Sequence, residues 1–583
     1  MRGTLARHSL MLLSGAALLA LTPHAARAQI NATATNPCPR FAAGINIPEP
    51  PNLFSRDGRL TVALSYNSMP DPNGNTRYCF TTPDGTETPT LFVKPGDTLT
   101  VIVKNNLPAP ASAASMAPVT NASTVCGAAS QDASSVNVHY HGTNTSPTCH
   151  SDEVIHTLIN SGQTFTYHIA FPANEPPGLY WYHPHVHGLA EIAVQGGAAG
   201  AIVVEGIQNV QPAVAGLPAR IFVIRDQLLP VGSPGESPPG GPVPGWDLSV
   251  NFVPILYPNF VPGNIRIRPG ERQFWRVSNS CADTVLDLQV VYDGVPQVIQ
   301  IVGLDGVPTG SQDGTSTGTL VPVTDVRVPP ASRVEFIVNG PALSVQNAIF
   351  QTLFVNTGPA GDNDPQRTLF TITPDFNAPE PSLRVPAVDG DAGPKRFAGL
   401  ATAPVTTNRT LYFSEDNPNQ HFFITVQGQP PTLFSADNPP AIVTTQGSVE
   451  DWTIQNQSNE NHEFHFHQIH FLLLERNGVP VPPEERQFLD MIEVPFNPNS
   501  DPTVNPPSVK VRMDFRGPDI GDFVYHCHIL NHEDHGMMAI IRVLPRDSAG
   551  NSTPSSNRKA TVKSLAKGAR EGTDATAGTV VPK

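Results

Sequence analysis

Short runs in which apolar and polar positions alternate recur along most of the chain. Two early examples are residues 60–64 and 98–103, and the turn Pro95-Gly96-Asp97 comes directly before the second run. Alternation with a period of two is typical of strands that bury one face, and a proline-glycine pair marks a turn. We therefore predict an all-β fold made of many short strands.

The same rhythm of turn and strand divides the chain into three blocks. A turn followed by an apolar run recurs at residues 94–97, 268–271 and 445–448. Repeated units of this kind indicate related sandwich domains. We place these domains at residues 45–206, 215–375 and 400–546.

The two ends of the sequence differ from the blocks between them. The N-terminal end has arginines at positions 2 and 7, an apolar stretch over residues 10–21 and the tripeptide Ala26-Arg27-Ala28. This pattern predicts a signal peptide over residues 1–28 that is cut before Gln29, and its apolar stretch is too short to span a bilayer. An uncleaved membrane anchor is the alternative. We expect an exported protein, periplasmic or secreted, and a disordered tail over residues 547–583.

Composition limits the partners of this chain. It has 62 prolines, 46 glycines and a formal net charge of −15. An acidic protein does not suit nucleic acid, and outside the N-terminal end no segment reads as a membrane span. Six cysteines suit disulfides in an exported protein. Cys126 and Cys149, which flank the first histidine motif, are one plausible pair, but the sequence leaves the connectivity open.

The strongest chemical signal lies in residues 525–537. Cys527 stands between His526 and His528, and His532 and Met537 follow it. A thiolate, imidazoles and a weak thioether are the ligands of a blue copper site. Neighbours on a strand point to opposite faces, so His526 and His528 face away from any metal that Cys527 binds.

Three other histidine motifs provide partners for those two residues. His139 and His141, His183 and His185, and His465 and His467 are each His-x-His pairs, which on a strand share one face. With His526 and His528 they give eight imidazoles, a number that suits a trinuclear copper cluster. The residues that remain for a mononuclear site are His462, Cys527, His532 and Met537.

In this order and spacing, the four motifs resemble those of the multicopper oxidases, the family of laccases, bilirubin oxidases and bacterial copper oxidases. The resemblance covers nearly all of the chain after the predicted signal peptide. It implies three cupredoxin-like Greek-key domains, with the trinuclear cluster between the first and the third. One departure is Glu463, which stands where the family usually has proline.

The resemblance also implies a role for each ligand and four coppers per chain. Type 1 copper would take His462, Cys527, His532 and axial Met537, and type 2 copper would take His139 and His465. One type 3 copper would take His141, His183 and His528. The other would take His185, His467 and His526. Met538 is the alternative axial ligand. Glu533 is the first candidate for proton delivery and Asp152 the second. His150, His187, His470 and His535 exceed the ligand count.

The implied function is a laccase-like oxidation. Four one-electron oxidations of a phenolic or aromatic amine donor would reduce one O₂ to two waters. The alternative is a metallo-oxidase acting on Cu(I), Mn(II) or Fe(II), although the chain has only eight methionines and no methionine-rich insert. A copper-free structural relative is disfavoured because every ligand position is intact. The donor, the redox potential and the oligomeric state stay open, and we favour a monomer.

Overall fold

The computed structural model describes residues 31–546 except 34, 111–116, 119–124, 314–317, 500 and 502. The predicted signal peptide and the predicted C-terminal tail lie outside these residues. The described residues up to Leu544 belong to one compact unit. The predicted domain boundaries are not tested by this division into units and stay predictions. None of the described helices is long and apolar enough to cross a membrane.

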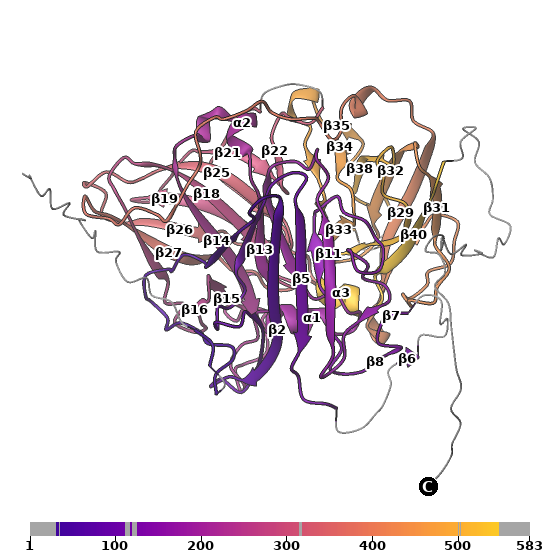
Figure 1. Cartoon of the computed structure of the whole chain (residues 1–583), viewed down its shortest axis with the longest axis horizontal. Coiled ribbons are helices and arrows are strands. Elements are labelled where there is room, and N and C mark those ends of the chain that lie inside the picture. The colour runs from indigo at the N-terminus through magenta and orange to yellow at the C-terminus, as the bar shows by residue number, and fades with distance from the viewer. Residues whose placement is uncertain are drawn as a thin grey trace, which may run out of the picture. The chain divides into compact units, whose positions relative to one another are not determined.

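Two main sheets make up the first block (Figure 1). One has the order β1 (Asn52–Phe54), β4 (Thr90–Val93), β13 (Gly200–Val204), β12 (Gly178–His183) and β9 (His139–His141). The other has the order β11 (Thr164–Ala170), β5 (Thr98–Asn105), β2 (Arg59–Pro70) and β3 (Thr76–Thr81). Two short pairs complete the block: β7 (Cys126–Gly127) with β10 (Thr157–Leu158), and β6 (Ala117–Pro118) with β8 (Ser130–Gln131).

The second block also consists of two sheets. The strands of the larger sheet follow the order β16 (Val253–Ile255), β15 (Asp247–Val250), β14 (Pro218–Gln227), β18 (Arg272–Asn279), β25 (Arg333–Asn339), β21 (Ile299–Leu304) and β22 (Val307–Pro308). Two further strands pair with this sheet, β23 (Val321–Val323) with β21 and β28 (Leu383–Arg384) with β14. The smaller runs β17 (Gly263–Ile267), β27 (Arg367–Pro374), β26 (Ala348–Thr352), β19 (Leu286–Tyr292) and β20 (Val295–Pro296), with β24 (Asp325–Val328) on β19.

The third block repeats the arrangement. One sheet runs β30 (His421–Val426), β29 (Thr407–Asp416), β32 (Val449–Asn456), β38 (Ser508–Asp514), β34 (Phe471–Arg476) and β35 (Val479–Pro480), with β36 (Phe488–Leu489) on β34. The other runs β31 (Ile442–Thr445), β40 (Met538–Leu544), β39 (Gly521–Cys527), β33 (His462–Phe466) and β37 (Met491–Val494). The all-β prediction is confirmed.

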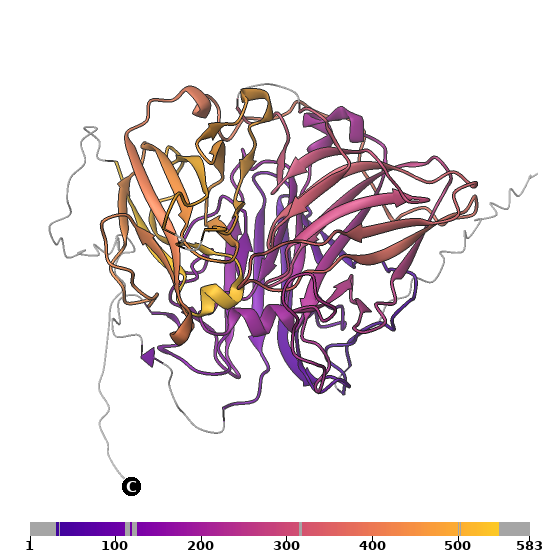
Figure 2. The ribbon, with the colours of Figure 1, turned by 180° about the vertical axis from the view of Figure 1, so that it is seen from behind.

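Helices are few and short. They are α1 (Ala190–Gln195), α2 (Ile207–Val210), α3 (Leu530–Asp534) and the 3₁₀ turns η1 (Pro212–Val214), η2 (Leu400–Thr402), η3 (Asn417–Asn419) and η4 (Pro483–Glu485). Helix α1 follows the histidine motifs of the first block, α3 follows the Cys527 motif of the third block, and the two helices contact each other. Figures 1 and 2 show these two helices side by side from opposite sides of the molecule.

Alternation explains the strands. In β5, Leu99, Val101 and Val103 are buried while the residues between them are half-buried, the pattern of a strand with one face on the core. Each block has a separate apolar core, with Trp275 in the second and Trp452 in the third. Burial of these side chains drives the folding of each sandwich.

Two disulfides lie in the first block. Cys126 is bonded to Cys149, as the sequence suggested, and Cys38 is bonded to Cys79. Of the described cysteines, Cys281 and Cys527 stay free, and both are buried. The thiol of the fourth histidine motif is therefore available as a ligand.

Candidate metal centre

Cys527, His462 and His532 converge inside the third block. The Cys527 Sγ lies 3.6 Å from His462 Nδ1 and 3.7 Å from His532 Nδ1, and these two nitrogens are 3.1 Å apart. Cys527 ends β39, His462 begins the adjacent β33, and His532 lies on α3 just after. One sulfur and two imidazole nitrogens that face a common point fit the ligand set of a blue copper site. We call these three residues the thiolate group.

The surroundings favour the ionised form of Cys527. Burial opposes ionisation, but the contacts with His462 and His532 outweigh it and lower the pKa of Cys527 to about 6. The backbone N–H of Glu463 also donates to the Sγ at 3.3 Å. Because the thiolate is the form that binds a metal, the side chain is held close to its ligating state.

The outer ring nitrogens of the thiolate group face polar side chains that the sequence did not single out. His462 Nε2 lies 2.8 Å from Ser458 Oγ and 3.1 Å from Glu415 Oε1. His532 Nε2 lies 3.5 Å from Glu460 Oε1. Contacts of this kind orient a metal-ligating histidine through its second nitrogen. Glu460 was within reach of a sequence argument because it is close to His462 along the chain, but Glu415 gave no signal.

The two adjacent methionines lie in different surroundings. Met537 is fully buried in the same apolar cluster as Cys527, and its amide N–H donates to the His532 carbonyl at 3.0 Å. Met538 pairs with His526 between β39 and β40 and lines a cavity beside His185. The methionine next to the thiolate group is therefore Met537, and its role as axial ligand stays a prediction.

Eight other histidines form a second group where the first and third blocks meet, and each is at most 1% exposed. They are the four predicted pairs: His139 and His141 on β9, His183 and His185 at the end of β12, His465 and His467 at the end of β33, and His526 and His528 at the end of β39. We call them the eight-histidine group. Strand pairing sets His183 opposite His139 and His526 opposite His465.

The ring nitrogens of this group lie close to one another. His526 Nε2 is 3.3 Å from His185 Nε2 and 3.1 Å from His467 Nε2. These three are the set predicted for one type 3 copper, and their ligand atoms lie within 4.8 Å of one another. His139 forms two further sets within the same limit, one with His141 and His183 and one with His465 and His467. The division of the eight among individual coppers stays a prediction.

The chemistry of the eight-histidine group fits metal ions. Buried nitrogens without a hydrogen-bond partner among the described residues include Nε2 of His139, His183 and His465 and both ring nitrogens of His528. Burial lowers the pKa of His141, His183, His185, His465, His467, His526 and His528. Unpaired buried nitrogens are costly, whereas neutral imidazoles are ligands that copper prefers. The group therefore fits copper.

Glu533 lies against the outer side of the eight-histidine group. Its Oε1 is 3.6 Å from His185 Nδ1 and its Oε2 is 3.7 Å from His526 Nδ1, and the side chain is fully buried. Burial and the adjacent Asp534 raise the pKa of Glu533 well above its usual range. A carboxyl group in this position can hold a proton close to two of the predicted ligands.

Asp152 also contacts the eight-histidine group, but its oxygens are used differently. Its Oδ1 accepts a hydrogen bond from the Tyr140 N–H at 3.0 Å and lies 2.9 Å from His139 Nδ1. Its Oδ2 accepts a hydrogen bond from Gln468 Nε2 at 2.8 Å. This carboxylate is placed to orient His139, and its role in proton delivery stays a prediction.

The second block also reaches the eight-histidine group, although it contains no histidine. Arg333, on β25, donates to both carboxylate oxygens of Asp490, one of them at 2.8 Å. Asp490 Oδ1 lies 3.4 Å from His141 Nε2. His470, one of the surplus histidines, donates from Nε2 to the Asp305 carbonyl at 2.7 Å, and Asp305 belongs to the second block. Sequence reasoning missed Arg333 and Asp490, because nothing in their local sequence marks contacts across such separations.

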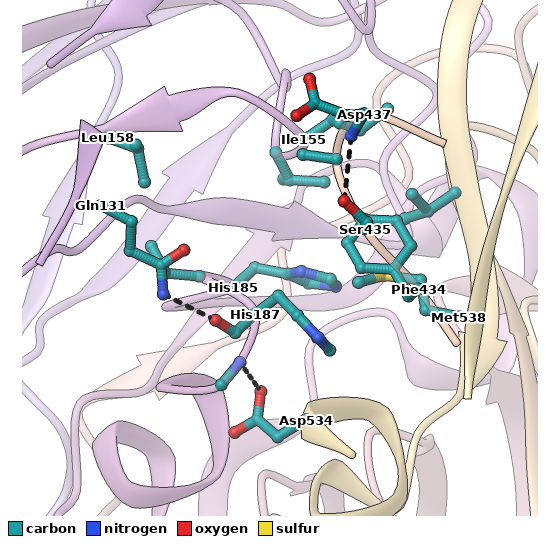
Figure 3. Close-up of a pocket in the computed structure, with 15 residues that line it drawn as sticks. Gln131, Ile155, Leu158, His185, His187, Phe434, Ser435, Asp437, Asp534 and Met538 are labelled. Atoms are coloured by element: carbon teal, nitrogen blue, oxygen red, sulfur yellow. Dashed lines mark hydrogen bonds between the residues drawn. The ribbon is translucent and has the colours of Figure 1, made fainter. Parts of the chain in front are cut away.

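A cavity of about 330 Å³ opens beside the eight-histidine group (Figure 3). His185, His187 and Asp534 line one part of it, and Phe434 and Met538 another. The surplus His187 thus faces the cavity, with its carbonyl accepting a hydrogen bond from Gln131. The cavity therefore lies next to a predicted ligand, His185.

The two remaining surplus histidines are exposed and belong to neither group. His150 is exposed and stacks on Phe165 at 4.5 Å between ring centres. His535 is exposed on the turn after α3, where its Nδ1 lies 2.7 Å from the Asn531 carbonyl.

Comparison with known proteins agrees with this geometry. Two models of the multicopper oxidase family match residues 129–209 and 402–547. A laccase of Bacillus subtilis is 23% identical over 402 residues, covering 63% of this chain and 71% of the laccase.

Solved structures share the fold. A variant of the Aquifex aeolicus multicopper oxidase McoA superposes with a TM-score of 0.62 at 17% identity, over 86% of this chain and 100% of that one. A multicopper oxidase of Campylobacter jejuni, described as a metallo-oxidase, superposes with a TM-score of 0.61 at 21% identity, over 87% of this chain and 96% of that one. At these identities the likeness shows the fold, which is the predicted set of cupredoxin-like sandwiches.

The family matches lie on the first and third blocks, which carry the histidine motifs. Their ligand atoms converge as a thiolate group and an eight-histidine group, both suited to copper. Both matched regions fit models of multicopper oxidases, and the relatives found are multicopper oxidases, so the chain is a copper-dependent oxidoreductase with O₂ as acceptor.

Proposed function

We propose that the chain couples four one-electron oxidations of a phenol or aromatic amine to the reduction of O₂ to two waters. The position of Cys527 carries this proposal. Its Sγ faces His462 and His532, while the adjacent His526 faces His185 and His467. When bound, copper would supply the redox centres, four ions divided between the two groups.

By resemblance, each residue of the two groups has a proposed role. Type 1 copper would be held by His462, Cys527, His532 and Met537, type 2 copper by His139 and His465, and the two type 3 coppers by the remaining six histidines. Cys527 is one peptide bond from His526 and from His528, so its sulfur and the backbone form the shortest covalent path between the groups. This tripeptide therefore serves as the route for electrons.

The outer edge of His532 is the proposed contact for the donor. His532 is 5% exposed, and Phe422 stacks on its ring with 4.3 Å between ring centres. An aromatic side chain beside this edge supports stacking of an aromatic donor. Because a radical product leaves after each electron, the donor requires no deep pocket.

Protons for the reduction of O₂ would come through Glu533. Its carboxyl group bridges the outer nitrogens of His185 and His526 at 3.6 and 3.7 Å. A positioned carboxyl group of this kind can pass protons to a reacting oxygen. Asp152, which already binds His139 and Gln468, is the second candidate.

A metal-ion donor is the second candidate function, and one observation favours it. Carboxylates flank both histidines of the thiolate group, Glu415 beside His462 and Glu460 beside His532. Carboxylate oxygens attract cations such as Mn(II) or Fe(II). The Campylobacter jejuni relative is itself described as a metallo-oxidase.

Export to the periplasm or the medium is also proposed. The N-terminal pattern of charge, apolar stretch and Ala26-Arg27-Ala28 supports it. The disulfides Cys38–Cys79 and Cys126–Cys149 suit an oxidising compartment. N-terminal sequencing of the protein recovered from its producing cells should begin at Gln29, and an intact Met1 would contradict cleavage.

One set of measurements tests the proposed function. Copper per chain and the blue absorption band are measured first, and then O₂ uptake with a phenol, Cu(I), Fe(II) and Mn(II). We expect about four coppers, a blue band and O₂ uptake with the phenol. Absence of the blue band in a copper-loaded sample would contradict the thiolate site. Uptake with a metal ion but with no organic donor would replace the first candidate by the second.

A further inference from the structure

The backbone N–H of Glu463 makes a contact with the thiolate group that the proposed roles leave unused. It donates a hydrogen bond to the Cys527 Sγ, with 3.3 Å between nitrogen and sulfur. In the described chain, the other polar contacts of this sulfur are with His462 Nδ1 and His532 Nδ1, at 3.6 and 3.7 Å. A bound copper would take those two nitrogens as ligands. Among the described residues, Glu463 is then the hydrogen-bond donor that stays on the sulfur.

Strand pairing holds this N–H in place. Glu463 lies on β33, and its carbonyl accepts a hydrogen bond from the His528 N–H at 2.7 Å, just after the end of β39. In an antiparallel pair, the N–H and the C=O of one residue face the same neighbouring strand. The Glu463 N–H therefore points toward β39, where it meets the Cys527 Sγ. The sheet fixes the donor, and the hydrogen bond requires no side chain of residue 463.

Burial strengthens this hydrogen bond. Glu463 and Cys527 are both 0% exposed, so water does not compete for the sulfur. A hydrogen bond is electrostatically stronger in buried surroundings than in water, and a bond to an ionised acceptor is stronger than one between neutral groups. The N–H therefore stabilises negative charge on the Cys527 sulfur.

The carboxyl group of Glu463 lies on the opposite face of β33. Phe464, the next residue, packs in the same apolar cluster as Cys527, and neighbours on a strand point to opposite faces. Glu463 is paired with Glu493 of β37, and neither of its carboxyl oxygens has a hydrogen-bond partner among the described residues. The N–H and the carboxyl group of this residue can therefore be changed separately.

We propose that the Glu463 N–H, acting through the Cys527 sulfur, raises the reduction potential of the proposed type 1 site. The inference rests on the type 1 role proposed above for the thiolate group. Hydrogen bonding around the cysteine sulfur is one of the properties that tune the potential of such a site. Cu(I) withdraws less charge from the thiolate than Cu(II) does, so a donor to the sulfur favours the reduced state.

Proline, which the family usually has at position 463, could not make this hydrogen bond, because it has no backbone N–H. The departure noted in the sequence therefore adds a donor to the thiolate group. A higher potential would let the site accept electrons from donors that hold them more tightly.

Glu463→Pro tests the proposal in the copper-loaded full chain, with Glu463→Ala as the matched control. Both variants lose the carboxyl group, but the alanine variant keeps the N–H, so any effect of the carboxyl group appears in both. His462 lies on a strand, the conformation that residues before proline prefer. The blue band is titrated against a series of redox mediators of known potential.

Relative to Glu463→Ala, the proline variant should shift the one-electron reduction equilibrium about tenfold toward the oxidised state, which is about 59 mV. Its blue band should move to longer wavelength, because the sulfur electrons are less stabilised. Equal potentials in two variants that both have the blue band would overturn the proposal. Absence of the band in the unchanged chain would instead contradict the proposed type 1 site, so the two failures differ.

A second measurement decides if Glu463→Pro does not fold. Glu463→Ala is produced with ¹⁵N-labelled alanine, which places the label in the amide of residue 463. Pulsed EPR of the oxidised blue site should show a coupling to ¹⁵N, since the hydrogen bond carries spin density from the sulfur to that amide. The unchanged chain with the same label is the blank, because its residue 463 is glutamate. A spectrum identical to the blank would overturn the proposal.

Discussion

The thiolate group and the eight-histidine group are built from different amounts of the chain. The third block alone provides His462, Cys527 and His532. The eight-histidine group takes its pairs from the first and third blocks, and the second block adds Arg333 through Asp490. His532 is 5% exposed, whereas the eight histidines are at most 1% exposed.

This difference matches the two proposed tasks. A site that takes electrons from a donor must have an edge near the surface, and one block can supply it. A site that reduces O₂ must exclude other reactants, and burial between blocks provides that seal. The comparison therefore predicts that changes at the thiolate group act on the donor side, and changes around the eight-histidine group act on O₂ reduction and on stability.

Cys527→Ser should have the largest effect. It removes the thiolate from the first group and cuts the electron path, so the blue band and donor oxidation should both be lost. Copper analysis should fall by about one ion in four, because the eight-histidine group is intact. Cys281→Ser is the control, since Cys281 is also a free buried thiol, and it should change neither. A blue band in Cys527→Ser would break the comparison.

Arg333→Gln should come next, as a test of the contribution of the second block. It leaves the buried Asp490 carboxylate without its partner, which should destabilise the protein by about 3–5 kcal/mol in denaturant unfolding. Copper in the eight-histidine group should fall while the blue band stays. Arg276→Gln, which breaks the buried pair with Glu335 on the same sheet, is the control. It should lower stability but leave copper content unchanged.

Glu533→Gln should slow only the reoxidation of the protein by O₂. Anaerobic reduction of the blue band by the donor should keep its rate, and reoxidation by O₂ should slow by about 100-fold, because a proton donor is removed. Glu191→Gln, on α1, is the control, since the Glu191 carboxylate accepts a hydrogen bond from Asn531 and forms no ion pair with the eight histidines, all of which the structure describes. Equal slowing of both half-reactions would argue against a proton-delivery role.

Glu460→Gln should have the smallest effect, on the donor side alone. Loss of one charge 3.5 Å from His532 Nε2 should raise KM for Fe(II) or Mn(II) by about fivefold. KM for an uncharged phenol should stay the same. Glu485→Gln, an exposed change of equal charge, should alter neither. Equal changes for the ion and the phenol would mean that Glu460 acts through His532 and does not attract the cation.

Much of the fold and of the candidate site could be predicted from local patterns. Period-two alternation indicated strands, and the spacing of each His-x-His pair placed both rings on one strand face. The same rule separated Cys527 from His526 and His528, and in the structure these side chains do serve different groups. The bridge between Cys126 and Cys149 was suggested by position alone.

The residues that surround the ligands could not be predicted in the same way. Glu415 contacts His462 from 47 residues away, and Arg333 contacts Asp490 from 157 residues away. Such contacts depend on which strands pair and how the sandwiches meet.

Residue type and short spacing were thus sufficient for the metal-binding chemistry, because both are properties of one strand. Which rings share a site was decided by the β9–β12 and β33–β39 pairings and by the contact between the first and third blocks. Which carboxylates and arginines contact these histidines was decided by packing alone. Burial changes the pKa and the hydrogen-bonding needs of a side chain only after the chain has folded around it.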